Sequence, residues 1–113
     1  MKQAIIRTAE QEEYLHPDHK LFFVRDVVTA ATNQYLSLHR GRIEPNGEIL
    51  MHSQAQSETI YVLSGEVVCT IGAEESTLGA GSCVVVAPEI ARGLKNIADQ
   101  PAELLIVFAP PRC

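Results

Sequence analysis

Short apolar runs separated by turn residues are the feature that most constrains how this chain can fold. The turns include Pro45-Asn46-Gly47, Ser64-Gly65-Glu66 and Gly79-Ala80-Gly81, whose residue types favour tight turns. A spacing of about 8–12 residues between such turns favours a β-sandwich or barrel over alternating strands and helices. Val, Ile and Thr, which suit pleated strands, supply 25 of the 113 residues. The sequence therefore predicts an all-β fold.

Each apolar run predicts one strand. The expected strands cover residues 3–7, 20–28, 34–43, 49–52, 58–63, 67–71, 75–78, 82–86, 93–96 and 102–108. One turn of helix is expected within residues 8–14, because His16-Pro17-Asp18 would end it. No linker or internal repeat interrupts the chain, so we expect a single domain over residues 1–113. Residues 34–108 would form the barrel core, and residues 1–33 would form N-terminal strands and a turn.

The composition of the chain argues against nucleic-acid and membrane partners. Nine Lys and Arg residues against fourteen Asp and Glu residues give a formal charge of −5, which argues against a nucleic-acid partner. The apolar runs are far shorter than the roughly 20 residues that span a bilayer, and no export signal follows Met1. We therefore expect a cytoplasmic protein with no membrane partner.

The cysteines form no C-x-x-C pair, and Cys69 and Cys83 lie in apolar runs, where buried free thiols are expected.

The chemistry-bearing residues concentrate between positions 45 and 65. In an extended chain, residues of equal parity share a face, so His52 and Gln54 project together. Glu58, on the next strand, can point toward them from the side. Ile60 and Val62 have the same parity as Glu58 and would be buried on that face. A polar cluster at one end of an apolar interior is how a barrel builds a small-molecule pocket.

These residues stand in the spacing of the first motif of the cupin family. That motif runs from a glycine through His-x-His to a glutamate and a second glycine. Here Asn46-Gly47, His52, Gln54, Glu58 and Gly65 occupy the corresponding places. The segment from 81 to 96 resembles the second motif, with Gly81 and Asn96 at the expected ends. Ser82, Ala87 and Glu89 depart from that motif, and Arg92 takes the place of its histidine.

The resemblance implies a small jelly-roll β-barrel, also called a double-stranded β-helix, with a ligand or substrate pocket inside. It also implies one divalent metal ion, of which His52, Glu58 and Gln54 would be the ligands in this chain. His52 and Glu58 would then be the catalytic residues of an enzyme acting on a small polar metabolite. His39, on a strand that flanks the pocket in this family, could contribute a ligand.

The altered residues leave a second interpretation open. A guanidinium beside a cation site repels the cation, and Arg92 offers a bidentate fork to the carboxylate of Glu58. In this alternative no metal is bound, an Arg92–Glu58 ion pair replaces it, and Gln54, Arg92 and His39 bind the ligand. The protein would then be a ligand-binding or sensing cupin, or a metal-free isomerase with His52 as general acid or base.

Two further expectations concern the N-terminal part. His16 and His19 flank a proline in a polar turn, so both are expected in solvent. The run Lys20-Leu21-Phe22-Phe23-Val24 carries more apolar side chains than one barrel wall needs, which favours a homodimer packed through this segment.

Overall fold

Nine β-strands and one short 3₁₀ helix make up the fold. The computed structural model describes residues 1–113. The elements are the 3₁₀ helix η1 (Thr8–Glu10), β1 (Glu13–Leu15), β2 (Lys20–Val28), β3 (Ser37–His52), β4 (Ser57–Ser64), β5 (Glu66–Ile71), β6 (Glu74–Gly79), β7 (Cys83–Val86), β8 (Arg92–Asn96) and β9 (Ala102–Ala109). None of the chain's helical structure is long and apolar enough to cross a membrane.

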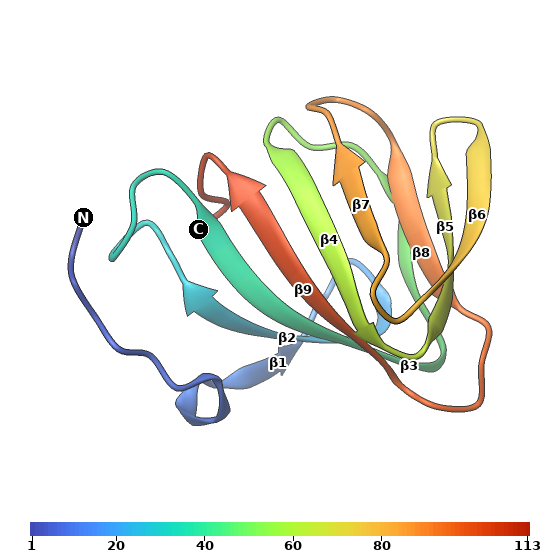
Figure 1. Ribbon diagram of the computed structural model, residues 1–113, viewed down its shortest axis with the longest axis horizontal. Helices are drawn as coiled ribbons and strands as arrows, with labels where there is room; N and C mark the ends of the chain where they lie inside the picture. The colour runs from blue at the N-terminus through green and yellow to red at the C-terminus, as the bar shows by residue number, and fades with distance from the viewer.

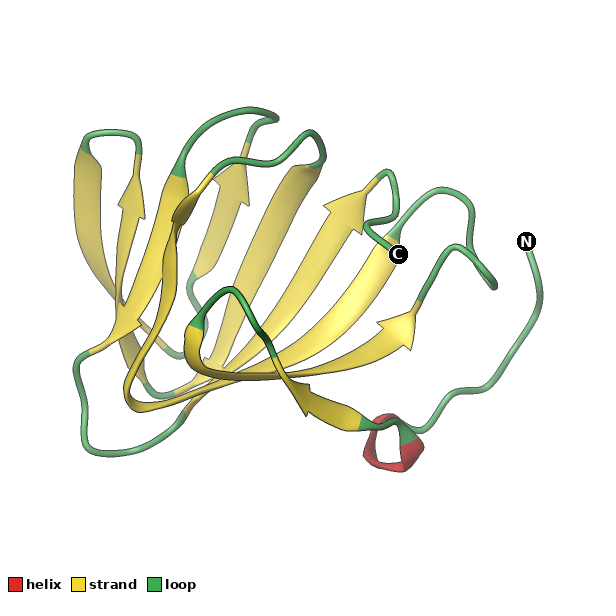
Figure 2. Ribbon diagram, turned by 180° about the vertical axis from the view of Figure 1, so that it is seen from behind, coloured by secondary structure: helices red, strands yellow, loops and turns green.

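All strand pairs are antiparallel and belong to one sheet. Its order is β6-β5-β8-β3-β9-β4-β7, with β2 also pairing with β3, and β1 with β2. The sheet curls into a half-barrel, as the two opposite views show (Figures 1 and 2). The expected all-β jelly-roll fold is thus confirmed. In Figure 1 the chain ends at the top of β9, beside the start of β3.

The strand β3 replaces two strands that the sequence predicts separately. Its first half, from Ser37 to Ile43, pairs with β9, whereas Glu48 and Ile49 pair with β8. The expected turn around Asn46 is instead a bend within one strand, with a φ of 67° at Asn46. A Cβ on Gly47 would lie 2.8 Å from the carbonyl oxygen of Glu44 and 2.9 Å from that of Leu21, so only glycine fits there. The bend lets one strand serve both walls of the barrel.

Alternating burial along the strands builds the core. Strand β9 buries every second residue, and β4 does the same at Glu58, Ile60 and Val62, as its parity predicts. Fifteen buried apolar residues form one continuous core cluster. Because Glu58 shares the inward face with this cluster, the fold places a carboxyl group inside an apolar barrel.

Several local expectations are wrong. Residues 3–7 form no strand, because they pair with no neighbour, whereas the single helical turn expected within residues 8–14 is present as η1. Cys83 is exposed, since it occupies an outward position of β7, whereas Cys69 is buried as expected. The homodimer expected through the N-terminal segment stays a prediction: within that segment Phe22 and Val24 are buried inside their own chain, whereas Leu21 is 42% exposed.

Candidate functional site

A cavity of about 430 Å³ opens beside the inner face of β3. All four histidines of the chain line it, together with Gln54, Glu58, Asp18 and Arg112. The rest of the lining is mostly apolar and comprises Phe22, Val24, Ile49, Leu50, Met51, Ile106 and Phe108. An apolar cavity with a few convergent polar groups is the usual form of a small-molecule site.

His16 and His19 belong to this cavity, and the expectation that they lie in solvent is wrong. The turn that carries them, between β1 and β2, lies in front of the curled sheet in Figure 2. His16 is only 4% exposed, and its ring lies 4.5 Å from that of His19, centroid to centroid. The His19 ring lies 4.9 Å from that of His52. Burial lowers the pKa of His16, and lowers that of His19 to about 4, so both imidazoles are uncharged at neutral pH.

His52 and Gln54 lie together, as their parity predicts. The Nδ1 atom of His52 donates to the carbonyl oxygen of Leu50 at 2.8 Å, which leaves Nε2 as the acceptor of the neutral ring. The amide nitrogen of Gln54 lies 2.8 Å from that Nε2 atom and donates to it. The backbone therefore fixes the tautomer of His52 so that its lone pair faces the Gln54 side chain.

Glu58 and Arg92 form the ion pair expected from their motif positions. The Nε atom of Arg92 lies 3.2 Å from Oε1 of Glu58, and the two side chains are 0% and 5% exposed. Burial raises the pKa of the Glu58 carboxyl to about 7, and the guanidinium of Arg92 opposes this rise. Glu58 lines the cavity, whereas Arg92 lies outside the lining residues and behind it. The carboxyl group thus stands between a buried cation and the cavity.

The guanidinium of Arg92 is poorly satisfied. None of its three nitrogen atoms has a hydrogen-bond acceptor, although all are fully buried. A buried donor without an acceptor costs about 1–3 kcal/mol, and more when it is charged. Only its charge interaction with Glu58 compensates the guanidinium within the chain, which makes this pair a costly feature for the fold to hold.

His39 faces the interior and lines the cavity, but both of its ring nitrogens are engaged. Nδ1 lies 2.7 Å from Oδ1 of Asp26, and Nε2 lies 2.9 Å from the hydroxyl of Ser37. The Sγ atom of Cys113 belongs to the same group, in which the ligand atoms of Asp26, His39 and Cys113 lie within 4.8 Å of one another. Such a trio has the residue types of a metal site, yet His39 already uses both nitrogens in hydrogen bonds.

The residues of the motif positions do not suit the divalent metal that the resemblance implies. Of the expected ligands, His52 and Glu58 are good donors, and Gln54 offers at best a carbonyl oxygen, which suits hard cations. The fourth position holds Arg92, whose fixed charge lies 3.2 Å from the carboxylate that a metal would need. The guanidinium therefore competes with a cation for Glu58.

Four cavity residues were not predicted from the sequence, namely His16, His19, Asp18 and Arg112. No motif marks them, and they come from the turn before β2 and from the segment after β9. The only available signal was the pair of histidines directly before an apolar strand.

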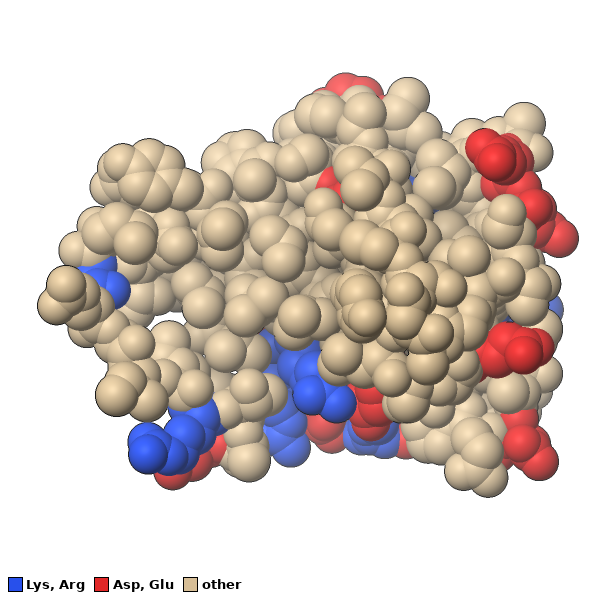
Figure 3. Space-filling model, in the orientation of Figure 1, with Lys and Arg blue, Asp and Glu red and all other residues tan.

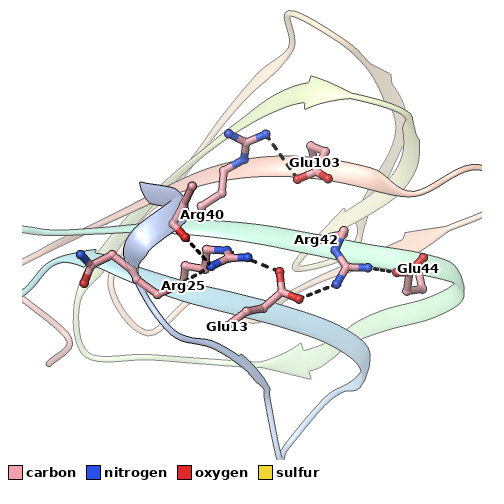
Figure 4. A network of polar contacts seen from close by, with 8 residues as sticks. Glu13, Arg25, Arg40, Arg42, Glu44 and Glu103 are labelled. Atoms are coloured by element: carbon pink, nitrogen blue, oxygen red, sulfur yellow. Dashed lines mark hydrogen bonds and ion pairs between the residues drawn. The ribbon is translucent and has the colours of Figure 1, made fainter. Parts of the chain in front are cut away.

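A second group of charged side chains lies on the outer surface of β1, β2, β3 and β9 (Figure 4). Arg42 contacts both Glu13 and Glu44, Arg25 also contacts Glu13, and Arg40 contacts Glu103. The four arginine–glutamate contacts other than Arg92–Glu58 are all part-exposed. Exposed ion pairs of this kind contribute about 0–1 kcal/mol each, so we interpret this group as a solvated surface.

Comparison with known proteins gives the same picture. The family model described as "Cupin domain" matches residues 39–108. An uncharacterised protein of Streptomyces coelicolor is 35% identical over 57 residues. The chain spans about half (53%) of the length of this curated relative. That match covers 50% of the present chain.

Solved structures resemble the whole chain at low identity, which bears on the fold alone. An RmlC-like cupin from Shewanella frigidimarina has a TM-score of 0.84 at 18% identity, over 98% of this chain and 94% of that one. The polyketide cyclase RemF from Streptomyces resistomycificus has a TM-score of 0.84 at 17% identity, over 95% and 79%. A predicted oxalate decarboxylase from Thermotoga maritima has a TM-score of 0.83 at 15% identity, over 95% and 99%. With its motif spacing, its curled antiparallel sheet and its interior cavity, the chain belongs to the cupin family.

Proposed function

We propose that this cupin is a metal-independent acid–base enzyme that moves a proton on a small carbonyl compound held in its cavity. The observation that carries the proposal is the state of Glu58, a buried carboxyl group that lines the cavity and has a pKa of about 7. A group with a pKa near the working pH is the most effective general acid or base. Perturbed carboxyl groups of this kind concentrate at functional sites.

The two catalytic residues would have complementary roles. His52, whose Nδ1–H is held by the Leu50 carbonyl, presents the basic Nε2 atom and would accept a proton from the carbon next to the substrate carbonyl. Protonated Glu58 would donate its proton to the carbonyl oxygen, which gives an enol. For an α-hydroxy carbonyl compound, the His52 imidazolium would return its proton to the former carbonyl carbon while the Glu58 carboxylate takes the proton of the neighbouring hydroxyl, which completes an isomerisation and restores both residues. Gln54, which donates to Nε2, would yield its place to the substrate.

The relatives support chemistry inside this barrel without defining it. The neighbours include a polyketide cyclase and a protein titled as a predicted oxalate decarboxylase. Both names describe enzymes acting on oxygen-rich organic molecules. The cavity of about 430 Å³ in the present chain accommodates a molecule of that kind.

Deuterium exchange tests the proposal without knowledge of the natural substrate. Neutral carbonyl compounds such as hydroxyacetone and dihydroxyacetone are incubated with the full chain in D₂O with EDTA, and loss of the α-proton signal is followed by NMR. We expect catalysed exchange that falls by a factor of about 10²–10⁴ in Glu58→Gln and in His52→Ala. Glu66→Gln, which alters an exposed glutamate of β5, is the matched control and should retain the rate.

Three results would overturn the proposal. The first is exchange no faster than in buffer for every compound, which would favour a non-catalytic binding cupin. The second is exchange by the wild type that Glu58→Gln preserves. The third is near-stoichiometric iron, zinc, nickel or manganese in the purified protein, which would support the metal-dependent interpretation instead.

We also propose that the protein pairs with a second copy through the outer face of β4 and β7. Tyr61, Leu63 and Val85 are exposed on these strands, with Val85 at 75%. The side of the molecule seen in Figure 3 is largely free of charged side chains, which gather at its margins. We propose this face in preference to the N-terminal segment, because Phe22 and Val24 of that segment are buried inside their own chain.

A further inference from the structure

Arg112 places an unneutralised positive charge at the cavity. Arg25, Arg40, Arg42 and Arg92 each have a glutamate oxygen within 4.0 Å. No carboxylate lies that close to Arg112, which is the only arginine among the lining residues. Its nearest polar partner is the Nε2 atom of His16, 2.7 Å from Nη2. The partner of this guanidinium is thus an uncharged ring.

No carboxylate of the cavity forms an ion pair with Arg112. Burial keeps His16 and His19 uncharged at neutral pH, so neither adds to nor cancels the field of Arg112. The carboxyl of Glu58 lies against Arg92 and interacts more weakly with the charge of Arg112. Asp18 and Arg112 are both exposed, so water screens the charge of each, and the two form no ion pair. An anionic group that enters the cavity therefore meets one free guanidinium.

A chain of hydrogen bonds, buried between Ser37 and His39 and part-buried elsewhere, holds the backbone of Arg112 in place. The Arg112 N–H donates to the hydroxyl of Ser37 at 2.9 Å, and this hydroxyl donates to Nε2 of His39 at 2.9 Å. The Nδ1–H of His39 donates to Asp26 at 2.7 Å, and the Tyr14 hydroxyl donates to the same oxygen at 2.8 Å. Ser37 and His39 are 0% and 1% exposed. Every donor in the chain has its acceptor, so the segment after β9 has a fixed position before any ligand binds.

Ser37, His39 and Asp26 have the residue types of a nucleophile, its base and an orienting carboxylate. Ser37 is nevertheless sealed from solvent, and its oxygen accepts from the Arg112 amide. These three residues therefore position the backbone of Arg112 and do not act as a nucleophilic triad. Such preorganisation lowers the entropy cost of binding, because the backbone of the binding residue is already ordered.

We propose that Arg112 is the carboxylate-binding residue of the cavity and that the ligand is a small organic acid. The planar guanidinium binds a carboxylate through two parallel N–H···O contacts. The apolar part of the ligand would lie along Phe22, Ile106 and Phe108. The proposal deepens the proposed function by naming a substrate class, and it assumes the same cavity.

Matched acids and amides test this assignment. The full chain is titrated by NMR with three pairs of equal shape, namely acetate and acetamide, butyrate and butyramide, and phenylacetate and phenylacetamide. We expect at least one acid to bind at least tenfold more tightly than its amide. Arg112→Gln should abolish this preference, and Arg112→Lys should restore part of it, because lysine keeps the charge but not the fork. Arg7→Gln, which removes an exposed arginine of the N-terminal segment, is the control and should keep the full preference.

The proposal is overturned if no acid of the series binds the wild type better than its amide. It is equally overturned if Arg112→Gln keeps the preference, which would assign the carboxylate to Arg92 or another cation. The exchange assay of the proposed function uses neutral ketones and the Glu58→Gln variant. A failure of proton transfer and a failure of carboxylate recognition are therefore observed in separate experiments.

Discussion

Arg92 and Glu58 face each other inside the barrel, with Nε of Arg92 3.2 Å from Oε1 of Glu58 and almost no solvent on either side chain. In the cupin motifs these two positions belong to metal ligands. The guanidinium of Arg92 therefore lies where the family commonly binds a metal ion. The pair costs desolvation that its attraction only partly repays. Its retention at the cavity wall is consistent with a role for Glu58 in binding or chemistry.

The pH dependence of stability reports the state of Glu58. The folded carboxyl has a pKa of about 7, above its ordinary value of 4.5, so the folded state binds the proton more tightly. The stability that this contributes is complete below pH 4.5 and is lost as the pH rises to about 7. The glutamine of Glu58→Gln cannot ionise. The unfolding free energy of this variant should therefore rise relative to that of the wild type across this pH range, by on the order of 3 kcal/mol. Urea unfolding at several pH values measures the difference, and a difference that stays constant with pH contradicts the prediction.

Restoring the family's histidines should create a metal site. The double variant Gln54→His and Arg92→His supplies two imidazoles beside His52 and Glu58 and removes the competing guanidinium. Thermal unfolding with Co²⁺, Ni²⁺ or Zn²⁺ should then show stabilisation of about 2.7 kcal/mol at a metal concentration one hundred times the Kd. Adding His52→Ala should remove most of this effect. A wild type that binds these ions at the cavity as tightly as the double variant would refute the donor-set argument.

The buried histidines should make the protein acid-sensitive. Burial lowers the pKa values of His16, His19 and His39, so the unfolded state binds protons more tightly than the folded state. The associated stability is present above pH 6.5 and is lost as the pH falls toward the folded values, about 4 for His19. The Glu58→Gln background removes the opposing contribution of the carboxyl group.

In that background, His19→Asn should reduce the slope of stability against pH by up to about 1.4 kcal/mol per pH unit between pH 6 and 4.5. The asparagine oxygen can replace Nδ1 as the acceptor of the Leu50 amide. Urea unfolding gives the slope, and an unchanged slope would mean that His19 titrates in solvent.

Ser37 should matter more to stability than its size suggests. Ser37→Ala leaves His39 Nε2 without its donor in a buried position and the Arg112 N–H without its acceptor in a part-buried one. We expect a cost of about 1–3 kcal/mol and faster hydrogen exchange at the Arg112 amide. Ser57→Ala, which removes an exposed hydrogen bond to the Ala109 carbonyl, is the matched control and should cost about 0.5 kcal/mol or less. An equal loss of unfolding free energy in the two variants would show that the hydrogen bonds of Ser37 do not hold the Arg112 backbone in place.

The outer face of β4 and β7 should control the oligomeric state. Val85 is 75% exposed, so Val85→Lys places a charge in the proposed contact without disturbing the core. Light scattering after size exclusion should give a dimer for the wild type and a monomer for Val85→Lys. Ile97→Lys, at a 50% exposed position outside the strands, should remain dimeric. A monomeric wild type at micromolar concentration would dismiss the contact.

The sequence predicted what depends on local pattern and on motif spacing. Parity along β4 placed Glu58, Ile60 and Val62 on the inner face, and the register of the second motif brought Arg92 to Glu58. It did not predict that β3 continues through Asn46, because a left-handed residue marks a bend as well as a turn. His16 and Arg112 also escaped prediction, since their place in the cavity depends on how the segments outside the barrel strands fold back over it. Local pattern carries no information on that packing.

The concentration of every imidazole of the chain around one cavity has a practical consequence. The ring protons and nitrogens of the four histidines resonate apart from the rest of the spectrum, and none of these rings lies on a remote surface to give a background signal. A molecule that binds in the cavity lies among these rings and should perturb the chemical shifts of those nearest to it. The protein therefore carries its own set of spectroscopic reporters, with which extracts can be screened for the natural ligand without any added label.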